Sequence, residues 1–193
     1  MQDDDTALRT RKKYVGLFII AVMVLSAFGF VLSYAQGEKS NRYNGFKFSP
    51  YRNQWQVTID GIKTTFNYHP SDLESINLSG NITSVFNGPV VVLTYDPRSN
   101  FSAQMAEEQY FMGVSLHEHG RFALQALTNA SGTELQELSC ANATAEQPVV
   151  EFREDDSTGI VVVGSCVIAR GANQNDFYPL GERLLYSAYG VMP

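Results

Sequence analysis

The clearest pattern in the chain is an alternation of apolar and polar residues over positions 54–59 and 62–68. Such alternation is typical of strands with one buried face and one face in water. Asp60-Gly61 separates the two runs, and an Asp-Gly pair in this place indicates a two-residue hairpin turn. This register pairs Ile59 with Ile62 and Trp55 with Phe66, so the large apolar side chains share one face.

A continuous apolar run, Pro89–Tyr95, predicts a strand that is buried on both faces. Apolar residues then recur at helical spacing as far as about His119, and Gly120 is a suitable end for that helix. Residues 121–128 have the composition of a strand again. A strand, a helix and a strand in so short a span predict a βαβ unit with parallel strands. The helical stripe consists of Phe101, Met105, Met112 and Leu116.

The remaining elements complete the predicted fold class, a mixed α/β (α+β) domain with an amino-terminal hairpin at its periphery. Residues 46–50 are predicted as the first strand and 77–88 as an exposed loop. Ser71 is the expected cap of a short helix, with Glu74 three residues later. Val149–Arg153 and Ile160–Ala169 are expected to pair around the acidic turn 154–157, and a last helix is expected from about Asn175 to Tyr189.

The longest apolar run is Tyr14–Ala35, which has no charged residue. A membrane-spanning helix needs about 20 such residues. The sequence therefore predicts a cytoplasmic segment at 1–13, a transmembrane signal anchor at 14–35, a stalk at 36–45 and an extracytoplasmic α/β domain at 46–193. Two alternatives are a signal peptide cleaved before Gln36 and a pilin-like subunit processed near Lys13, its apolar helix packed in a filament.

Two features indicate that the domain lies outside the cytoplasm. Basic residues 9–13 directly precede the apolar run, as expected for a cytoplasmic amino terminus. Five Asn-x-Ser/Thr triplets, the acceptor pattern for N-glycosylation, all follow the run. Their asparagines are Asn77, Asn81, Asn100, Asn129 and Asn142. We therefore expect a single-pass protein of the cell membrane, in contact with the lipid bilayer.

Cys140 and Cys166 are the two cysteines of the chain. A pair of cysteines outside the cytoplasm is expected to form a disulfide, and closing a loop of this length stabilises a domain by roughly 3 kcal/mol. Two buried thiols or a redox pair are the alternatives, although a C-x-x-C motif is absent.

The best candidate for a ligand site is the segment that contains Asp96, Arg98 and Ser99, where a buried parallel strand gives way to a helix. Ligands bind at this edge of open α/β sheets, and free N–H groups at a helix amino terminus favour anions. The alternative is an ordinary turn and helix cap. This segment lacks the glycine-rich loop that lets a phosphate approach.

Other candidate chemistry is weaker. His117 and His119 point apart on a helix and cannot share a metal ion there, so we expect no metal site. The acidic run around Glu154 lacks the spacing of a calcium loop. The common hydrolase and nucleotide-binding motifs are absent, which favours a protein without enzymatic activity and without a cofactor. The net charge of −6 and the lack of a dense basic cluster in the domain argue against nucleic acid as a partner.

Several short segments accompany the apolar run, the Trp55 hairpin and Cys166: Tyr43-Asn44-Gly45-Phe46-Lys47-Phe48, Tyr68-His69-Pro70-Ser71-Asp72-Leu73-Glu74, Thr94-Tyr95-Asp96-Pro97, Cys140-Ala141-Asn142-Ala143-Thr144 and Arg183-Leu184-Leu185-Tyr186. In these features the chain resembles a group of small, uncharacterised archaeal membrane-anchored proteins to which no activity is assigned. The resemblance implies an archaeal surface setting and assigns no catalytic residue.

These features together predict a structural or interaction module, an accessory subunit that assembles with other membrane or envelope proteins. Small residues such as Gly16 and Gly29 in the apolar run are compatible with helix contacts in lipid. The alternative functions are an envelope ligand-binding or hydrolase domain that uses the loop Asp96–Asn100, and a pilin-like filament subunit.

Overall fold

The computed structural model describes residues 18–26, 41–82 and 85–193 and divides the chain into two units, Met1–Asn41 and Arg42–Pro193. In the first unit, residues 18–26 are helical. The rest of the predicted anchor, residues 14–17 and 27–35, lies outside the described residues, as do residues 1–13 and 36–40. Across the described parts, no helix has both the length and the apolar composition needed to cross a membrane.

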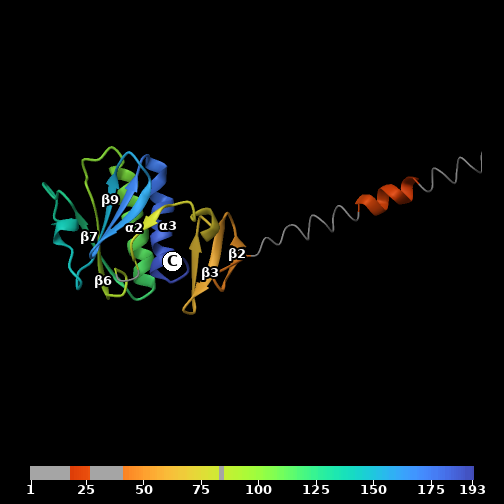
Figure 1. The fold of residues 1–193 in the computed structure, drawn as a ribbon, viewed down its shortest axis with the longest axis horizontal. Helices are drawn as coiled ribbons and strands as arrows, with labels where there is room; N and C mark the ends of the chain where they lie inside the picture. Colours follow the sequence, from red (N-terminus) through yellow and green to blue (C-terminus); the bar gives the residue numbers. More distant parts are fainter. Residues whose placement is uncertain (1–17, 27–40, 83–84) are drawn as a thin grey trace, which may run out of the picture. The chain divides into compact units, whose positions relative to one another are not determined.

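The second unit begins with a four-stranded antiparallel sheet in the order β1-β2-β3-β4 (Figure 1). The predicted hairpin is confirmed, because Ile59 pairs with Ile62 and Trp55 with Phe66. Asp60 and Gly61 have φ values of 50° and 83°, the left-handed backbone that a two-residue hairpin turn requires. The sheet starts at Arg42, inside the segment assigned to the stalk. Its strands are β1 (Arg42–Tyr43), β2 (Phe46–Tyr51), β3 (Gln54–Ile59) and β4 (Ile62–Phe66).

The second sheet has seven strands in the order β5-β10-β11-β9-β6-β7-β8. The β10–β11 pair is antiparallel and the other pairs are parallel. The predicted mixed α/β fold is therefore confirmed, including the parallel pair β6–β7 of the βαβ unit. The strands are β5 (Leu78–Ser79), β6 (Val90–Tyr95), β7 (Phe122–Leu127), β8 (Gln136–Glu137), β9 (Val149–Glu154), β10 (Gly159–Val163) and β11 (Cys166–Gly171).

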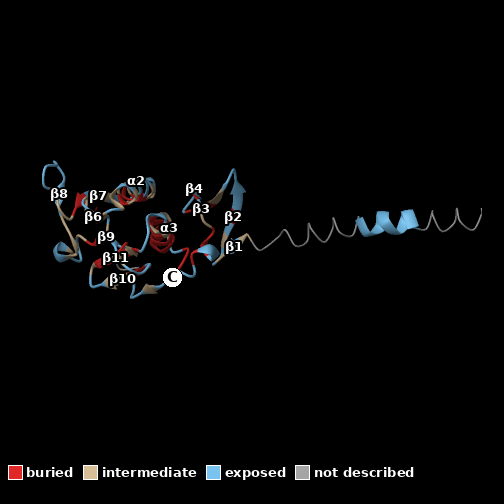
Figure 2. Cartoon of the chain, turned by 90° about the horizontal axis from the view of Figure 1, so that it is seen from above, coloured by how far each residue is buried: buried red, intermediate tan, exposed pale blue. Residues whose placement is uncertain are grey.

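Two helices lie against each other and pack on the larger sheet, α2 (Ser102–Glu118) and α3 (Phe177–Ala188). The structure also contains the short 3-10 helices η1 (Pro70–Asp72), η2 (Cys140–Asn142) and η3 (Gln174–Asp176). Figure 2 shows α3 as a buried element between the two sheets. Phe66 of β4 stacks on Tyr186 of α3 with ring centroids 4.1 Å apart. The main apolar core therefore joins both sheets through α3.

The predicted single strand Ile160–Ala169 is wrong, because this apolar run forms two strands. Gly164 has a φ of 59°, which lets the chain reverse between β10 and β11. The pairing expected around the acidic turn 154–157 is also wrong. β9 pairs with β11 and β6, and not with β10. An unbroken apolar run does not show where such a turn divides it, and the Gly-Ser dipeptide was the available signal.

Two smaller predictions also need correction. His69, and not Ser71, caps the short helix η1, and its side chain accepts a hydrogen bond from the Ser71 backbone N–H. The segment 77–88 is not simply an exposed loop. It contributes strand β5, and Ile82, Val85 and Phe86 are buried in the main core. This segment therefore supports the fold through three large apolar side chains.

The predicted disulfide between Cys140 and Cys166 is present, with the two Cα atoms 5.4 Å apart. It lies on the face of the large sheet away from the main core, beside the small cluster that contains Val92, Ala126 and Val149. The bridge links η2 to β11, so it fastens the connection between β7 and β9 to the sheet.

Candidate functional site

The predicted site residues Asp96, Arg98 and Ser99 do come together at the carboxyl end of β6. Asp96 Oδ1 accepts hydrogen bonds from the Arg98 backbone N–H at 2.9 Å and from Nε at 3.0 Å, and Oδ2 accepts one from Nη2 at 2.8 Å. The Arg98 hydrogen bonds hold the pKa of Asp96 below its ordinary value. This ion pair lies on the surface, where such pairs contribute little to stability.

The carboxylate of Glu154 binds the loop just before α2, and not the first turn of the helix, where an anion was expected. Glu154 Oε2 accepts hydrogen bonds from Ser99 Oγ at 2.6 Å and from the Asn100 backbone N–H at 3.1 Å. The Ser99 and Asn100 side chains lower the pKa of Glu154. A shallow cleft of about 440 Å³ lies beside these groups. The polar groups of this loop thus bind one another, which leaves little for a ligand.

The histidines make no metal site. His119 Nε2 lies 2.8 Å from Thr64 Oγ1, and its ring lies against the Tyr189 ring with centroids 4.2 Å apart. Burial lowers the pKa of His119, which disfavours its charged form. Among the residues that the structure describes, no group of three His, Cys, Asp or Glu side chains could hold a metal ion.

The predicted glycosylation sites lie on the surface, with one partial exception. Asn77, Asn81, Asn100 and Asn142 are exposed, while Asn129 is half-buried. Asn129 Oδ1 accepts a hydrogen bond from the Ser131 backbone N–H at 3.2 Å. The four exposed asparagines have the accessibility that a glycan acceptor requires, and their use in the cell remains a prediction.

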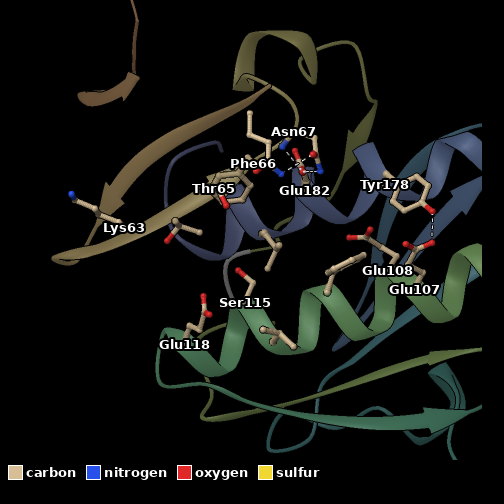
Figure 3. Close-up of a pocket in the computed structure, with 15 residues that line it drawn as sticks. Lys63, Thr65, Phe66, Asn67, Glu107, Glu108, Ser115, Glu118, Tyr178 and Glu182 are labelled. Carbon is tan, nitrogen blue, oxygen red and sulfur yellow. Dashed lines mark hydrogen bonds between the residues drawn. The ribbon is translucent and has the colours of Figure 1, made fainter. Parts of the chain in front are cut away.

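A larger cleft, of about 590 Å³, lies where β4 faces α2 and α3 (Figure 3). No local pattern of the sequence predicted it. Its lining combines carboxylates, small polar groups and apolar side chains, and Lys63 is its one basic residue. Its charged, aromatic and aliphatic lining residues include Lys63, Glu107, Glu108, Phe111, Val114, Glu118, Tyr178 and Glu182.

Glu182 forms the wall of the cleft where α3 meets β4. Its Oε1 accepts hydrogen bonds from the Asn67 backbone N–H at 2.7 Å and from Asn67 Nδ2 at 2.8 Å, and its Oε2 accepts one from the Tyr68 backbone N–H at 2.9 Å. Burial raises the pKa of Glu182, and these three donors oppose that change. The carboxylate therefore ties the end of the small sheet to α3.

Glu107, at the mouth of the cleft, also has a partner. Its Oε2 accepts a hydrogen bond from the Tyr178 hydroxyl at 2.5 Å, which raises the pKa of Tyr178 to about 12. Figure 3 shows this bond between α2 and α3. Glu107 and Tyr178 are thus linked across one end of the cleft.

Glu108 is different, because it is only 3% exposed and forms no hydrogen bond or ion pair with any described residue. Its carboxyl lies against the backbone of α3 at Gly181, where a Cβ would overlap Glu108 Oε1. Burial raises the pKa of Glu108 well above its ordinary value, and the charges of Glu182 and Glu107 raise it further. Within the described part of the chain, the carboxyl group of this buried side chain thus has no hydrogen-bond partner.

Exposed apolar side chains of α2 lie at the mouth of the cleft beside Glu107 and Glu118. Phe111 and Val114 are 51% and 41% exposed, and Tyr110 beside them is 58% exposed. The Tyr110 and Phe111 rings meet edge to face with centroids 5.8 Å apart. Phe111 and Val114 line the cleft together with the exposed Glu107 and Glu118, so a ligand that enters it meets apolar side chains and carboxylates first and the buried Glu108 side chain at depth.

Comparison of the chain with protein-family models, with curated proteins and with solved structures returned no match. The chemistry of the cleft therefore has to be inferred from its own residues.

Ser115 also lines the cleft, and its hydroxyl forms a hydrogen bond of 2.7 Å with the Tyr189 hydroxyl. The arrangement is suited to holding a ligand by apolar contact and charge.

Replacing Glu108 with glutamine is expected to stabilise the protein at high pH. A carboxyl whose pKa is raised in the folded state favours folding most at pH values below its unfolded pKa of about 4.3. The free energy of unfolding then falls as the pH rises from that value through the folded-state pKa. We expect Glu108→Gln to match the wild type near pH 4.5 and to exceed it by about 1 kcal/mol or more at pH 8.

Urea unfolding between pH 4.5 and 8 measures this difference, with Glu107→Gln as the control because Glu107 has a partner and is exposed. If the free energies of unfolding of the wild type and of Glu108→Gln changed in parallel over this pH range, burial would not disfavour the charged form of Glu108.

Proposed function

We propose that this protein is a membrane-anchored, extracytoplasmic interaction module, an accessory subunit of an envelope or membrane protein complex, without enzymatic activity. The apolar run 14–35 after basic residues, the five acceptor triplets and the disulfide support the membrane and extracytoplasmic setting. The cleft bounded by β4, α2 and α3 is the surface through which the module holds its partner.

One observation carries this proposal. The cleft combines exposed apolar side chains at its mouth with the unpaired, buried carboxyl of Glu108 at depth. A buried carboxyl without a partner lowers stability and is retained in proteins chiefly where it has a function. Exposed aromatic and aliphatic side chains next to each other are typical of surfaces that bind other proteins.

The alternative of a ligand-binding or hydrolase domain at the loop Asp96–Asn100 receives less support. The side chains of Asp96, Arg98, Ser99 and Asn100 are all engaged, with one another or with Glu154. A ligand there would have to break these bonds. The filament alternative depends on processing near Lys13, which lies outside the described residues.

Polar substitutions in the cleft are expected to release the partner and to leave the fold intact. Phe111→Ser and Val114→Ser remove apolar contact area from half-exposed positions, so their effect on unfolding should be within about 0.5 kcal/mol. Val163→Ser is the matched control, since Val163 is 62% exposed on β10 and does not line the cleft.

The test is purification of the full-length chain from its own membranes in mild detergent, followed by measurement of partner stoichiometry. We expect a stoichiometric partner with the wild type and with Val163→Ser, and its loss with Phe111→Ser and Val114→Ser. A partner that stays with both cleft variants would contradict the proposed surface.

A further inference from the structure

The geometry points to a specific occupant: the cleft receives a lysine or arginine side chain from a partner polypeptide, with its cationic head at the Glu108 carboxyl. This inference rests on the proposed function and adds the chemistry of the contact. It concerns the same cleft, and its test is arranged so that it can fail while the proposed function stands.

The lining of the cleft has more acidic than basic side chains. Four carboxyl groups line the cleft, Glu107, Glu108, Glu118 and Glu182, against the single cation Lys63. Glu107 and Glu182 already accept hydrogen bonds from protein donors. Glu108 is the buried carboxyl that has no donor within the described chain. A cationic group is therefore the complement that the cleft lacks.

The cleft has an apolar part and an acidic part, which match the two parts of a long cationic side chain. Phe111 and Val114 line the cleft with partly exposed side chains, and the buried Glu108 side chain, labelled in Figure 3, lies between α2 and α3. Lysine and arginine have an apolar stem and a charged head, so one side chain can satisfy both parts of the cleft. A volume of about 590 Å³ exceeds the space of one side chain and leaves room for neighbouring residues of a polypeptide.

Helix α3 leaves space for the Glu108 carboxyl at Gly181. Gly181 lies within α3, where glycine is less favourable than alanine by about 1 kcal/mol. A Cβ at this position would overlap the Glu108 carboxyl group. The helix thus accommodates an acidic side chain in a place that an apolar residue could fill at lower cost, which is expected if the carboxyl contacts a ligand.

Proton release gives a further test. Burial raises the pKa of Glu108, and a cation bound beside the carboxyl would lower it again, so affinity for a cation is expected to rise with pH. Lysine and arginine stay charged over this range. The other titratable groups around Glu108 in the cleft are Lys63 of β4, Glu107 and Glu118 of α2, and Tyr178 and Glu182 of α3.

The test is a titration of the full-length chain in detergent with three probes, in which ligand-observed NMR measures the binding of each probe. The probes are N-acetyl-lysine N-methylamide, its arginine counterpart and the neutral N-acetyl-norleucine N-methylamide. We expect a cationic probe to bind at least about tenfold more tightly than the neutral one at pH 8, and to lose that advantage in Glu108→Gln. Glu107→Gln is the matched control and should keep it.

Equal binding of the neutral probe, unchanged binding to Glu108→Gln, or no binding of either cationic probe would overturn the inference. The same variants applied to the native complex separate the two proposals. A partner lost with Phe111→Ser but kept with Glu108→Gln leaves the proposed function in place and rejects the cationic contact. A partner kept with both rejects the proposed function as well.

Discussion

Replacing Glu182 with alanine is expected to lower the free energy of unfolding by about 3 kcal/mol, because each hydrogen bond to a charged group is worth about 1.5–3 kcal/mol. Glu182 accepts three hydrogen bonds, two of them from the backbone N–H groups of Asn67 and Tyr68. Those donors lie where the small sheet ends against α3. Without the carboxylate these donors lose their acceptor, and of the polar contacts between this end of the sheet and α3 the bond from the Tyr186 hydroxyl to the Tyr68 carbonyl remains.

Urea unfolding at pH 7 measures the effect, and two further variants make it specific. Glu182→Gln keeps the shape and one acceptor oxygen, so we expect roughly half the loss. Glu107→Ala removes a carboxylate of the same cleft that accepts one bond, from the Tyr178 hydroxyl, and should cost less than about 1 kcal/mol. If Glu182→Ala proved no more harmful than Glu107→Ala, the attachment of β4 to α3 would have to reside elsewhere.

Gly181→Ala is expected to destabilise the protein by about 3 kcal/mol, although alanine is the better helix former. The added Cβ would overlap the Glu108 carboxyl, which is wedged between α2 and α3. The carboxyl would have to move, and with it the packing of the two helices. Thermal unfolding at neutral pH measures this loss, and ligand-observed NMR with the lysine probe should show weaker binding.

Removal of Glu108 should relieve that conflict. In a Glu108→Ala background we expect Gly181→Ala to cost less than about 1 kcal/mol, so the double-mutant cycle shows a large interaction energy. Gly113→Ala in α2 is the matched control. Its Cβ would meet only ordinary contacts, the nearest at 3.6 Å, so a gain of up to about 1 kcal/mol is expected. Independent effects at positions 181 and 108 would contradict the geometry described for the cleft.

Features fixed by local sequence were predictable. The Asp60-Gly61 turn and the alternation around it gave the pairing of Trp55 with Phe66 as observed. The run Pro89–Tyr95 and the stripe that ends at Gly120 gave β6, α2 and the parallel β7. The two cysteines gave the disulfide. In each case the signal and the structure lie within a short stretch or depend on one possible pair.

The cleft was not predictable in the same way, since its parts are far apart in the chain. Glu182 bonds to Asn67 and Tyr68, more than 110 residues earlier, and no local pattern encodes that contact. Two hints were present. Glu108 falls on the same helical face as Met105 and Met112, and Gly181 interrupts an otherwise regular helix. An acidic residue on a buried face and a glycine within a helix each indicate a special contact.

The loop Asp96–Asn100 shows the opposite case. Its position at the end of a parallel strand was predicted correctly, but no local pattern indicated that Glu154 would bind Ser99 and Asn100 just before α2. Glu154 comes from β9, a strand that is adjacent to β6 in the sheet and distant in sequence. A favourable location in the fold therefore does not by itself leave polar groups free for a ligand.

The measurement that tests the central claim most directly is the partner stoichiometry of the full-length chain, purified from its own membranes by mild detergent and weighed by native mass spectrometry. We expect a glycosylated chain that co-purifies with a stoichiometric partner for the wild type and for Val163→Ser. For Val114→Ser we expect the chain without that partner. A wild-type chain without a partner, or equal stoichiometry in all three, would contradict the central claim.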